Sequence, residues 1–470
     1  MPYSSEKLCA VILAAGEGKR MRSSKPKVLL EVLLKPMLGW VLDAARDAGV
    51  SDLCVVTGHL EEQIKAYLGG SAETVTQHER KGTGHAVMMA RDFLERHRGG
   101  KVLIACGDAP FLSCETITRA LEQHNARADA VTVISATLDD PYGYGRIIRN
   151  PAGSVKAIVE QKEGTPEQLD VHEVNSGAYW FDVDVLLEVL DPEHLSASGI
   201  TGEHYLTDAV AAIISIGKGA GAYAAHDKDV VRGANTPKQL HELGELARTK
   251  IIDDHLDNGV NIPCTDGVII GPDVTIGSDT TILPGTVITG KTSIGDGCLI
   301  GPTSVIENSI IGKNVHVNAS QVRASKVLDG SDIGPYSQLR PDCSVGENCH
   351  IGDFVELKNS TIGSGSFISH MSYIGDCDVG VNVNIGCGSV TVNYDGINKH
   401  RCSIGDNAFI GCNTNLIAPV SIGANSYTAA GTTVTEDLPE GSRAIGRARA
   451  AIKNDWTKDR FGGNADGSQE

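Results

Sequence analysis

The stretch KTSIGDGCLIGPTSVIENSIIG, residues 291–312, contains three Ile-Gly pairs, which begin at residues 294, 300 and 311. Pairs of Ile or Val with glycine recur throughout the second half of the chain, beginning at residues 270, 276, 294, 300, 311, 333, 345, 351, 362, 374, 379, 385, 404, 410 and 422. Most steps are 6, 12 or 18 residues, with slips of one residue at 311, 362 and 379. A period of six fits neither an α-helix nor simple strand alternation, and it is typical of a β-helix built from hexapeptide repeats.

The composition agrees with this interpretation. The chain has 54 glycines and only 4 % aromatic residues, as a thin repeated structure of small and β-branched side chains requires. We expect each Ile or Val to point into a narrow core, and the glycine after it to turn a corner with a positive φ angle. Three sides make a coil of about 18 residues, so residues 260–440 would form roughly ten coils.

The first half has a different pattern, in which apolar strand-like runs alternate with helical ones. LCAVILAA (8–15), LCVVTG (53–58) and KVLIACGD (101–108) read as strands, and PMLGWVLDAARDAG (36–49) reads as a helix. This alternation predicts a doubly wound, mainly parallel α/β sheet. Functional loops should then follow the carboxyl ends of the strands.

A junction between the two halves is expected near residue 236. Thr236 and Pro237 have the character of an N-cap and a first-turn proline, and a helical pattern follows as far as Gly259. We therefore predict a first domain at 1–235, a linker helix at 236–259 and a β-helix domain with a polar tail at 260–470.

Charge and composition exclude several classes of protein. With 41 Lys+Arg and 59 Asp+Glu the net charge is −18, which disfavours nonspecific nucleic-acid binding. No apolar run approaches the length of a membrane span, and the sequence MPYSSEKL does not read as a signal peptide. The 12 cysteines include no C-x-x-C pair, so we expect reduced thiols in a cytoplasmic protein. The thiols of the coil region, Cys387 and Cys412 among them, are expected to stack in the core rather than to bind metal.

A glycine-rich turn, VILAAGEGKRM at residues 11–21, directly follows the first expected strand. Its backbone N–H groups could hold phosphate oxygens, and Lys27 downstream could add a positive charge. The turn matches neither G-x-G-x-x-G nor G-x-x-x-x-G-K-[ST]. Taken alone, it is equally consistent with a tight strand exit, and Lys27 with a solvated side chain.

Together these segments resemble the sugar nucleotidyltransferases. More closely, residues 7–450 resemble the family of bifunctional N-acetylglucosamine-1-phosphate uridylyltransferases/glucosamine-1-phosphate acetyltransferases. The resemblance is carried by QHERKGTGHA (77–86), CGDAP (106–110), YGYGRI (142–147), IVEQKEG (158–164), VNSG (174–177), GEHYLTD (202–208) and RGANTP (232–237). It implies a Rossmann-like nucleotidyltransferase domain followed by a left-handed parallel β-helix.

The resemblance implies a site in the first half that takes UTP and the sugar nucleotide. Its members are Leu13, Ala14, Ala15, Gly16, Lys27, Gln77, Gly82, Thr83, Cys106, Gly107, Asp108, Gly143, Glu160, Asn175 and Asn235, with Thr207 as a weaker candidate. Lys27 would be catalytic, and Asp108 and Asn235 would bind Mg²⁺, which prefers oxygen ligands. For Asp108 alone, a helix N-cap is the plainer alternative.

Polar residues also gather in the coil region, where stacking alone does not need them. Lys358 and His370 lie in one such segment, and NYDGINKH (393–400) breaks the repeat, because the step from 385 to 404 is 19 residues. An insertion out of register is where a binding loop is expected. A single histidine is more often a surface or core residue, but basic and amide groups recur around His370 at whole-coil distances.

The resemblance makes His370 the general base of acetyl transfer, a task that suits a neutral imidazole. It implies that the sugar phosphate is bound by Arg340, Lys358, Tyr373, Asn384 and Lys399. It implies that acetyl-CoA is bound by Cys387, Asn393, Tyr394, Cys412, Ala430 and Arg447. Two residues depart from the family's usual pattern, since Cys412 stands where serine is common and Asp342 where glycine is common.

The resemblance therefore implies two reactions. Acetyl-CoA would acetylate glucosamine 1-phosphate, and UTP would convert the resulting N-acetylglucosamine 1-phosphate to UDP-N-acetylglucosamine and pyrophosphate. The expected partners are these small molecules and, in a homotrimer, two further copies of the chain, without nucleic acid or membrane. One alternative is a one-reaction sugar-1-phosphate nucleotidyltransferase whose β-helix regulates or oligomerises; another is a structural β-solenoid scaffold.

Overall fold

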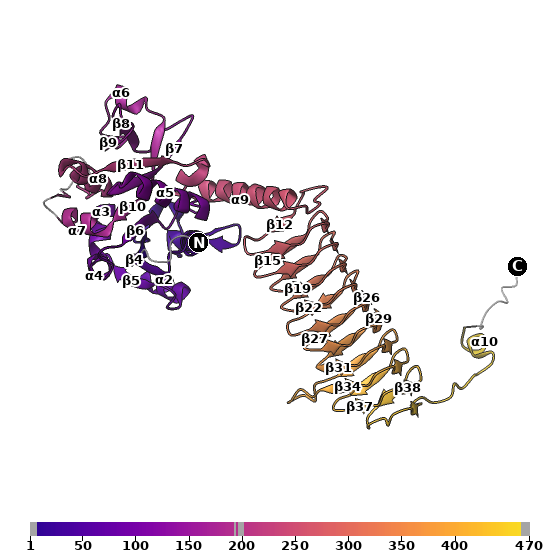
Figure 1. Ribbon diagram of the computed structural model, residues 1–470. Helices are drawn as coiled ribbons and strands as arrows, with labels where there is room; N and C mark the ends of the chain where they lie inside the picture. The colour runs from indigo at the N-terminus through magenta and orange to yellow at the C-terminus, as the bar shows by residue number, and fades with distance from the viewer. Residues whose placement is uncertain (1–6, 192–193, 196–201, 462–470) are drawn as a thin grey trace, which may run out of the picture. The chain divides into compact units, whose positions relative to one another are not determined.

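The computed structural model describes residues 7–191, 194–195 and 202–461 (Figure 1). The chain divides into two compact units, Met1–Lys250 and Ile251–Glu470. The boundary falls inside helix α9 (Pro237–Asp257). The Thr236 hydroxyl caps this helix by accepting a hydrogen bond from the Gln239 backbone N–H (3.3 Å).

The first unit is built on a nine-stranded sheet with a central order β11-β7-β10-β6-β1-β4-β5. Its strands are β1 (Leu8–Leu13), β4 (Asp52–Thr57), β5 (Glu73–Thr76), β6 (Lys101–Cys106), β7 (Val131–Thr137), β8 (Arg146–Arg149), β9 (Val155–Val159), β10 (Glu173–Asp182) and β11 (Ala220–Ala224). The pairs β1–β4, β1–β6, β4–β5 and β7–β11 are parallel, whereas β10 runs antiparallel to β6 and β7. A separate ribbon joins β2 (Glu31–Val32) and β3 (Lys35–Pro36).

Helices cover both faces of this sheet, because its central strands are apolar on both sides. The helices are α1 (Met37–Asp47), α2 (Glu61–Leu68), α3 (Thr83–Met89), α4 (Arg91–Arg96), α5 (Cys114–Arg127), α6 (Pro166–Leu169), α7 (Val183–Val189) and α8 (Leu206–Ser215), with short 3₁₀ turns η1 (Lys19–Met21), η2 (Lys27–Leu29) and η3 (Lys228–Val231). One core packs α1 and α5 against the sheet, and a second packs α3, α4, α7 and α8 against the other face. The predicted mainly parallel α/β fold is confirmed.

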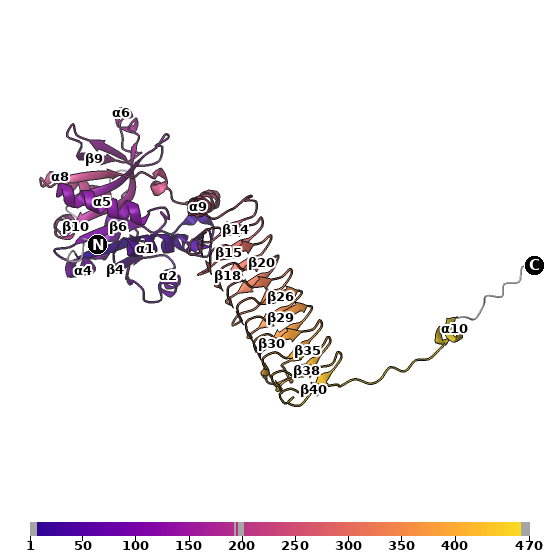
Figure 2. The same cartoon turned by 45° about the vertical axis from the view of Figure 1, so that its right-hand side comes forward.

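The second unit is a stack of coils with three parallel sheets (Figure 2). The first sheet holds β12 (Ile269–Ile270), β15 (Val287–Thr289), β18 (Val305–Glu307), β21 (Gln321–Arg323), β24 (Gln338–Leu339), β27 (Glu356–Lys358), β30 (Tyr373–Gly375), β33 (Val390–Val392), β36 (Asn415–Ile417) and β39 (Thr433–Val434). The second holds β13 (Thr275–Ile276), β16 (Ser293–Ile294), β19 (Ile310–Ile311), β22 (Lys326–Val327), β25 (Ser344–Val345), β28 (Thr361–Ile362), β31 (Cys377–Val379), β34 (Cys402–Ile404) and β37 (Ser421–Ile422). The third holds β14 (Thr281–Ile282), β17 (Leu299–Ile300), β20 (His316–Val317), β23 (Asp332–Ile333), β26 (His350–Asp353), β29 (Phe367–His370), β32 (Asn384–Ile385), β35 (Phe409–Ile410), β38 (Tyr427–Thr428) and β40 (Arg443–Ala444).

The repeat places its Ile and Val residues as predicted. Ile294, Ile311, Val345 and Ile362, all from the predicted pairs, stack along the second sheet and are 0–4 % exposed. The three sheets have ten, nine and ten strands, in agreement with the roughly ten expected coils. Beyond the last coil, helix α10 (Trp456–Phe461) lies in the tail.

The expectation for the glycines of the repeat was largely wrong. Only Gly301 and Gly334 among them have a positive φ angle (+103° and +101°). The others avoid collision with the next coil: a Cβ on Gly346 would lie 2.6 Å from the Ser364 backbone nitrogen. The left-handed corner lies two residues beyond these glycines, where Gly297 (φ +70°) and Asn314 (φ +54°) are typical occupants.

The cysteine prediction holds for part of the set. Cys298, Cys343, Cys349, Cys377 and Cys402 are buried in the β-helix core. Cys387 is half-buried and Cys412 exposed, because both lie two residues beyond their inward-facing isoleucines, on an outer corner. Within the described residues, His, Cys, Asp and Glu side chains form no cluster of three that could hold a metal ion, and no helix is long and apolar enough to span a membrane.

Adjacent isoleucines on β19 allow a matched test of the inward register. Ile311 is 2 % exposed and Ile310 is 48 % exposed. We expect Ile311→Ala to lower the unfolding free energy of the β-helix by about 2–5 kcal/mol, and Ile310→Ala to change it by no more than about 0.5 kcal/mol. Hydrogen exchange of the neighbouring coils against denaturant measures both; equal losses would contradict the register.

Candidate active sites

The glycine-rich turn of the first unit begins where β1 ends. The backbone N–H of Gly107, which follows β6, donates to the carbonyl of Leu13 (2.9 Å), so the loops after two neighbouring parallel strands meet. Ala14 and Ala15 are buried, whereas Gly16 is exposed, with no atom within 4 Å of where its Cβ would lie. The turn therefore presents open backbone at the carboxyl edge of the sheet, where ligands of open α/β sheets bind.

Three predicted residues from distant parts of the sequence converge beside this turn. The Lys27 ammonium donates to Oδ1 of Asn235 (2.7 Å) and forms an ion pair with the Asp108 carboxylate. Gly18, with φ +62°, packs against this lysine, since a Cβ there would lie 2.8 Å from the Cβ of Lys27. A carboxylate and an amide oxygen thus share one cation, and such oxygen ligands suit Mg²⁺.

The N-cap alternative for Asp108 is not what the structure shows. Helix α5 is capped by Ser113, whose hydroxyl accepts a hydrogen bond from the Thr116 backbone N–H (3.2 Å). Asp108 instead directs its carboxylate to Lys27. Its side chain is thereby free of a capping role.

The segment with Gln77, Gly82 and Thr83 is held against the start of helix α8. The side-chain amide of Gln77, which is 4 % exposed, donates to the carbonyl of Gly82 (3.0 Å). The Thr83 hydroxyl accepts from the backbone N–H of Leu206 (3.0 Å). A Cβ on Gly82 (φ +101°) would collide with the carbonyl of His204, so this position requires glycine.

A second group of predicted residues lies near β10. The Asn175 amide donates to the Tyr179 hydroxyl (2.6 Å), and its backbone N–H donates to the carbonyl of Gly145 (2.8 Å). The Thr207 hydroxyl donates to Glu160 (3.5 Å). Burial raises the pKa of Glu160, so this carboxyl can act as a proton-bearing donor more readily than an exposed one.

Two other predicted residues, Gly143 and Cys106, also lie in this unit. The Gly143 backbone N–H (φ +92°) donates to Oε1 of Gln161 (3.0 Å). Burial, together with the charge of Asp108, raises the pKa of the Cys106 thiol to about 12. Cys106 therefore remains a neutral thiol, which contacts the carbonyl of Gly177 (3.7 Å).

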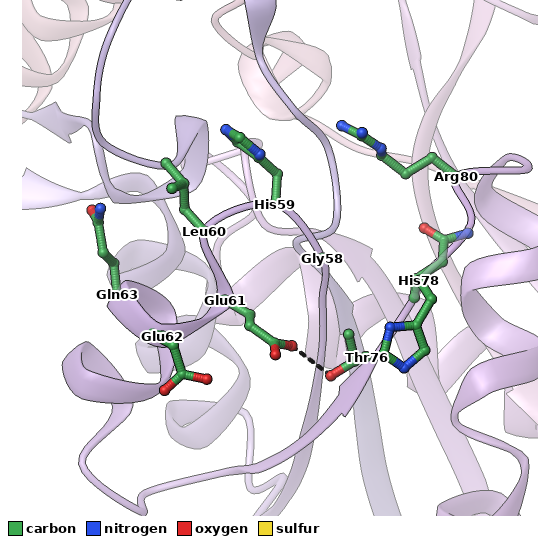
Figure 3. A pocket seen from close by; sticks show the side chains of 10 residues that line it. Gly58, His59, Leu60, Glu61, Glu62, Gln63, Thr76, His78 and Arg80 are labelled. Carbon is green, nitrogen blue, oxygen red and sulfur yellow. Dashed lines mark hydrogen bonds between the residues drawn. The ribbon is translucent and has the colours of Figure 1, made fainter.

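An open pocket of about 520 Å³ adjoins the glycine-rich turn (Figure 3). Its lining consists of Gly58, His59, Leu60, Glu61, Glu62, Gln63, Thr76, Gln77, His78 and Arg80. Gly58 packs on Ala15, since a Cβ there would lie 2.8 Å from the Ala15 carbonyl oxygen, and Arg80 pairs with Glu17 of the turn (2.6 Å). Of the lining, sequence reasoning singled out only Gln77, although Arg80 stands in the same quoted segment.

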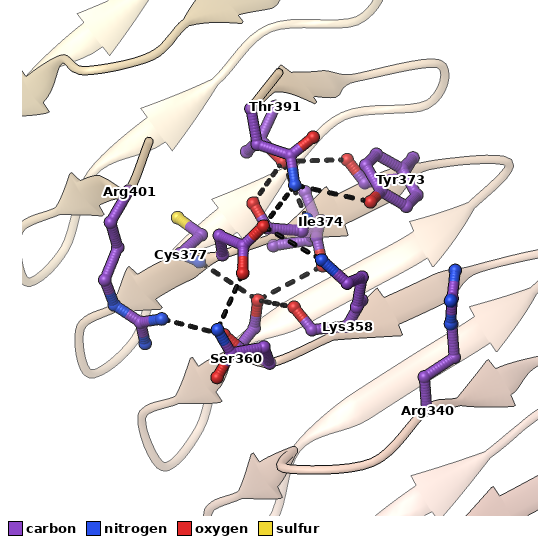
Figure 4. Close-up of polar contacts among 12 residues, drawn as sticks. Arg340, Lys358, Ser360, Tyr373, Ile374, Cys377, Thr391 and Arg401 are labelled. Atoms are coloured by element: carbon purple, nitrogen blue, oxygen red, sulfur yellow. Dashed lines mark hydrogen bonds and ion pairs between the residues drawn. The ribbon is translucent and has the colours of Figure 1, made fainter. Parts of the chain in front are cut away.

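In the β-helix, one carboxylate binds two predicted residues and one that was not predicted (Figure 4). Asp376 accepts hydrogen bonds from the Lys358 ammonium (3.1 Å), the Asn359 amide (2.6 Å) and the Asn393 amide. Burial alone would raise the pKa of Asp376, but these three donors outweigh it and hold the pKa below its usual range. Asp376 therefore remains ionised and fixes both the cation and the base of the inserted loop.

The predicted phosphate ligands form a cationic cluster around Lys358. Contact with the Lys399 amine and with the Asp376 carboxylate raises the pKa of Lys358, and the Lys358 ammonium lowers the pKa of Lys399. Arg340 lies one coil away in register and also lowers the pKa of Lys399. Its guanidinium donates to the exposed Glu356 (3.0 Å). These cations could jointly hold a phosphate.

His370 ends strand β29 on the adjoining side of the same coil. Its Nδ1 lies 2.5 Å from the Oδ1 of Asp353, directly beneath it in register. Tyr373 begins the next strand, and its hydroxyl accepts from the Asn393 amide (3.5 Å). Asn384 lies one coil further on the His370 sheet, paired with Phe367 rather than with His370.

Three of the residues predicted to bind acetyl-CoA, Cys387, Cys412 and Ala430, follow one another along one outer corner. The backbone N–H that follows Cys412 donates to the Cys387 carbonyl (2.7 Å), and the one that follows Ala430 donates to the Cys412 carbonyl (2.8 Å). Arg447 donates to the carbonyl of Ala430 (2.5 Å). Tyr394 is 55 % exposed and bridges to Lys399 across the inserted loop.

Sequence reasoning missed the two acidic residues of this site. Asp353 precedes His370 by 17 residues, and Asp376 follows Lys358 by 18. Both separations are about one coil. A search for acids one coil away from each proposed cation or imidazole would have found them.

Comparisons with known proteins cover both units. A MobA-like NTP transferase domain matches residues 10–164, a bacterial transferase hexapeptide model matches 401–436, and a hexapeptide repeat of succinyl-transferase matches 291–319. The bifunctional protein GlmU of Caldanaerobacter subterraneus subsp. tengcongensis is 46 % identical over 97 % of this chain and 99 % of its own length. The chain belongs to the GlmU family of bifunctional proteins.

Other GlmU proteins match to a similar extent. That of Acetivibrio thermocellus is 44 % identical over 96 % of this chain and 97 % of its own length, and that of Clostridium acetobutylicum is 45 % identical over 95 % and 98 %. Because these matches span both units, the one-reaction alternative is not favoured. A GlmU family member is also an enzyme rather than a scaffold.

The Asp376 network gives a testable pH dependence. Because its pKa is depressed in the fold, Asp376 stabilises the native state at neutral pH, and this contribution is lost as the pH falls through its folded pKa, below about 3.9. We expect Asp376→Asn to reproduce that loss at pH 7, costing about 1–3 kcal/mol of local stability. Amide exchange in residues 393–400 measures it. Asp378→Asn, which removes an exposed partner of Arg401, is the control, and an equal loss of protection there would contradict the assignment.

Proposed function

We propose that the chain catalyses two successive reactions, one in each unit. The β-helix unit transfers acetyl from acetyl-CoA to glucosamine 1-phosphate, and the first unit transfers UMP from UTP to the N-acetylglucosamine 1-phosphate so formed, releasing pyrophosphate. The observation that supports this most directly is the presence of two chemically different clusters in one chain. Lys27 with two oxygen ligands suits nucleotidyl transfer. An imidazole held by a carboxylate, in the same unit as a cluster of cations, suits acyl transfer to a sugar phosphate.

In the first reaction, two anions must approach each other, so charge neutralisation is the main task. Asp108 and Asn235 would hold Mg²⁺, which supplies that neutralisation when bound. Lys27 would then direct its ammonium to the phosphates, together with the N–H groups of the glycine-rich turn. Gln77, Gly82 and Thr83 would read the uracil, and the sugar and ribose would be held by Gly143, Glu160 and Asn175.

In the second site, Arg340, Lys358 and Lys399 would hold the sugar phosphate, and Tyr373 and Asn384 the sugar. His370 would take a proton from the sugar amine as its nitrogen attacks the thioester. Acetyl-CoA would lie along the corner formed by Cys387, Cys412 and Ala430, with contacts to Asn393, Tyr394 and Arg447. The exposed Cys412 thiol is a weaker hydrogen-bond donor than the serine common at this position.

We also propose that the protein works as a homotrimer in the cytoplasm. Leu299, Phe367, Phe409 and Tyr427 are exposed along one outer face of the β-helix, and a second copy would cover such an apolar face. All twelve cysteines are unpaired, which suits a reducing compartment. The net charge of −18 argues against nucleic-acid partners.

Asp108→Ala should abolish uridylyl transfer and leave acetyl transfer near normal, because its carboxylate contacts Lys27 in the first unit alone. Pyrophosphate release from UTP and N-acetylglucosamine 1-phosphate measures the first activity, and thiol release from acetyl-CoA the second. Wild-type reactions that omit UTP, acetyl-CoA, sugar phosphate or Mg²⁺ in turn serve as controls. Equal loss of both activities in a folded variant would refute the division.

His370→Ala should do the converse. Removing a positioned base typically slows the chemical step about 10²–10⁴-fold, so acetyl transfer should fall by that factor while uridylyl transfer persists. Arg340→Ala should instead raise the Michaelis constant for glucosamine 1-phosphate, because it removes a phosphate ligand. Acetyl transfer within a few-fold of wild type in His370→Ala would place the base elsewhere.

A further inference from the structure

A carboxylate that neither the resemblance nor the repeat pattern marks lies against the His370 ring. Asp353 ends strand β26, His370 ends strand β29, and the two are paired residues of the parallel ladder. The Oδ1 of Asp353 is 2.5 Å from Nδ1 of His370. The Asp353 carbonyl accepts from the Met371 N–H (2.9 Å), and the His370 carbonyl accepts from the Ser372 hydroxyl (2.9 Å), so the backbone on both sides of the pair is fixed.

The protonation of this pair follows from its contacts. The hydrogen bond with His370 lowers the pKa of Asp353, so the carboxylate is ionised at neutral pH. An ionised carboxylate only accepts hydrogen bonds. The proton between the two groups therefore belongs to Nδ1 of His370, which leaves Nε2 with a free lone pair.

We propose that Asp353 is a positioning residue for acetyl transfer: it selects the His370 tautomer in which Nε2 is the base and stabilises the imidazolium that forms when Nε2 takes a proton. The inference rests on the proposed role of His370. It adds a residue that touches neither substrate. Its effect would be on the chemical step rather than on binding.

The proton balance of the step is closed. The sugar amine nitrogen forms a bond to the thioester carbonyl carbon, and the bond from that carbon to sulfur breaks. A proton of the amine passes to Nε2 of His370 and then to the departing sulfur, which leaves as the thiol. The Nδ1 proton stays on the ring throughout, shared with Asp353.

Other charged groups on the same sheet also affect the pair formed by Asp353 and His370. His350, on the same strand as Asp353, also lowers the pKa of that carboxyl. Its own Nδ1 pairs with Asp332 of β23 (2.9 Å), which also faces His316 (3.1 Å). Strand β32 on the other side offers the neutral Asn384. Asp332 thus provides a matched acidic residue on the same sheet that contacts histidines other than His370.

The test compares Asp353→Asn with Asp332→Asn in the full chain, following acetyl transfer across the pH range. Asp353→Asn should lower kcat by about tenfold or more, leave both Michaelis constants within twofold, and move the acid limb of the kcat profile to lower pH, because the imidazolium loses its counter-charge. Asp332→Asn should match the wild type. Asp353→Glu should recover part of kcat, and uridylyl transfer should be unchanged throughout.

Two outcomes overturn the inference. If Asp353→Asn keeps the wild-type kcat and acid limb, or changes only a Michaelis constant, Asp353 does not position the base. If nitrogen-15 spectra of the wild-type His370 ring place the proton on Nε2, the tautomer assignment is wrong. His370→Ala distinguishes failure of the proposed function from failure of this inference. If His370→Ala retains acetyl transfer, His370 is not the base. If His370→Ala loses acetyl transfer but Asp353→Asn behaves as the wild type, only the positioning role of Asp353 is wrong.

Discussion

The β-helix depends on the close stacking of one coil on the next through parallel backbone hydrogen bonds. This spacing leaves no room for a Cβ where a corner backbone meets its neighbour, as at Gly346 against Ser364. It also brings every outward residue beside its counterpart about one coil away. Pairs such as Asp353 with His370 and Lys358 with Asp376 are thus direct products of the repeat. The polar contacts of the proposed site in the second unit therefore join residues that are about one coil apart in the sequence.

The same spacing explains which parts of the fold the sequence could predict. A six-residue period determines which side chains face inward, so the buried column from Ile294 to Ile362 followed directly from the pattern. The backbone conformation at the corners did not follow from the pattern. Most repeat glycines are required because a Cβ would collide with the neighbouring coil, not because their own φ angle is positive. Cys387 and Cys412 were misplaced for a related reason. Cysteine is a residue type that is usually buried, so a core position was expected. Both cysteines lie two residues after an inward-facing isoleucine, however, and this places them on the outer surface.

In the first unit the limit of prediction has a different origin. Lys27, Asp108 and Asn235 are brought together by the order of strands and by the chain's return after β11, which no local pattern encodes. The family resemblance named them, and the α/β pattern predicted the edge of the sheet at which they meet. The role of Asp108 was also ambiguous in the sequence, because an aspartate shortly before a helix can be its N-cap. The structure shows that Ser113 caps this helix instead.

The two acidic partners of the cationic cluster differ in a way that matters for a phosphate ligand. Asp376 is buried, and with three donors directed at it, it cannot be displaced without leaving a charge unpaired. Glu356 holds Arg340 in an ion pair that is exposed on both sides, and such pairs contribute little stability. At the proposed sugar-phosphate site, a phosphate would therefore replace Glu356 at the guanidinium at small cost, while Asp376 would keep Lys358 in place. In this proposal, Asp376 sets the geometry of the site, and the ligand displaces Glu356.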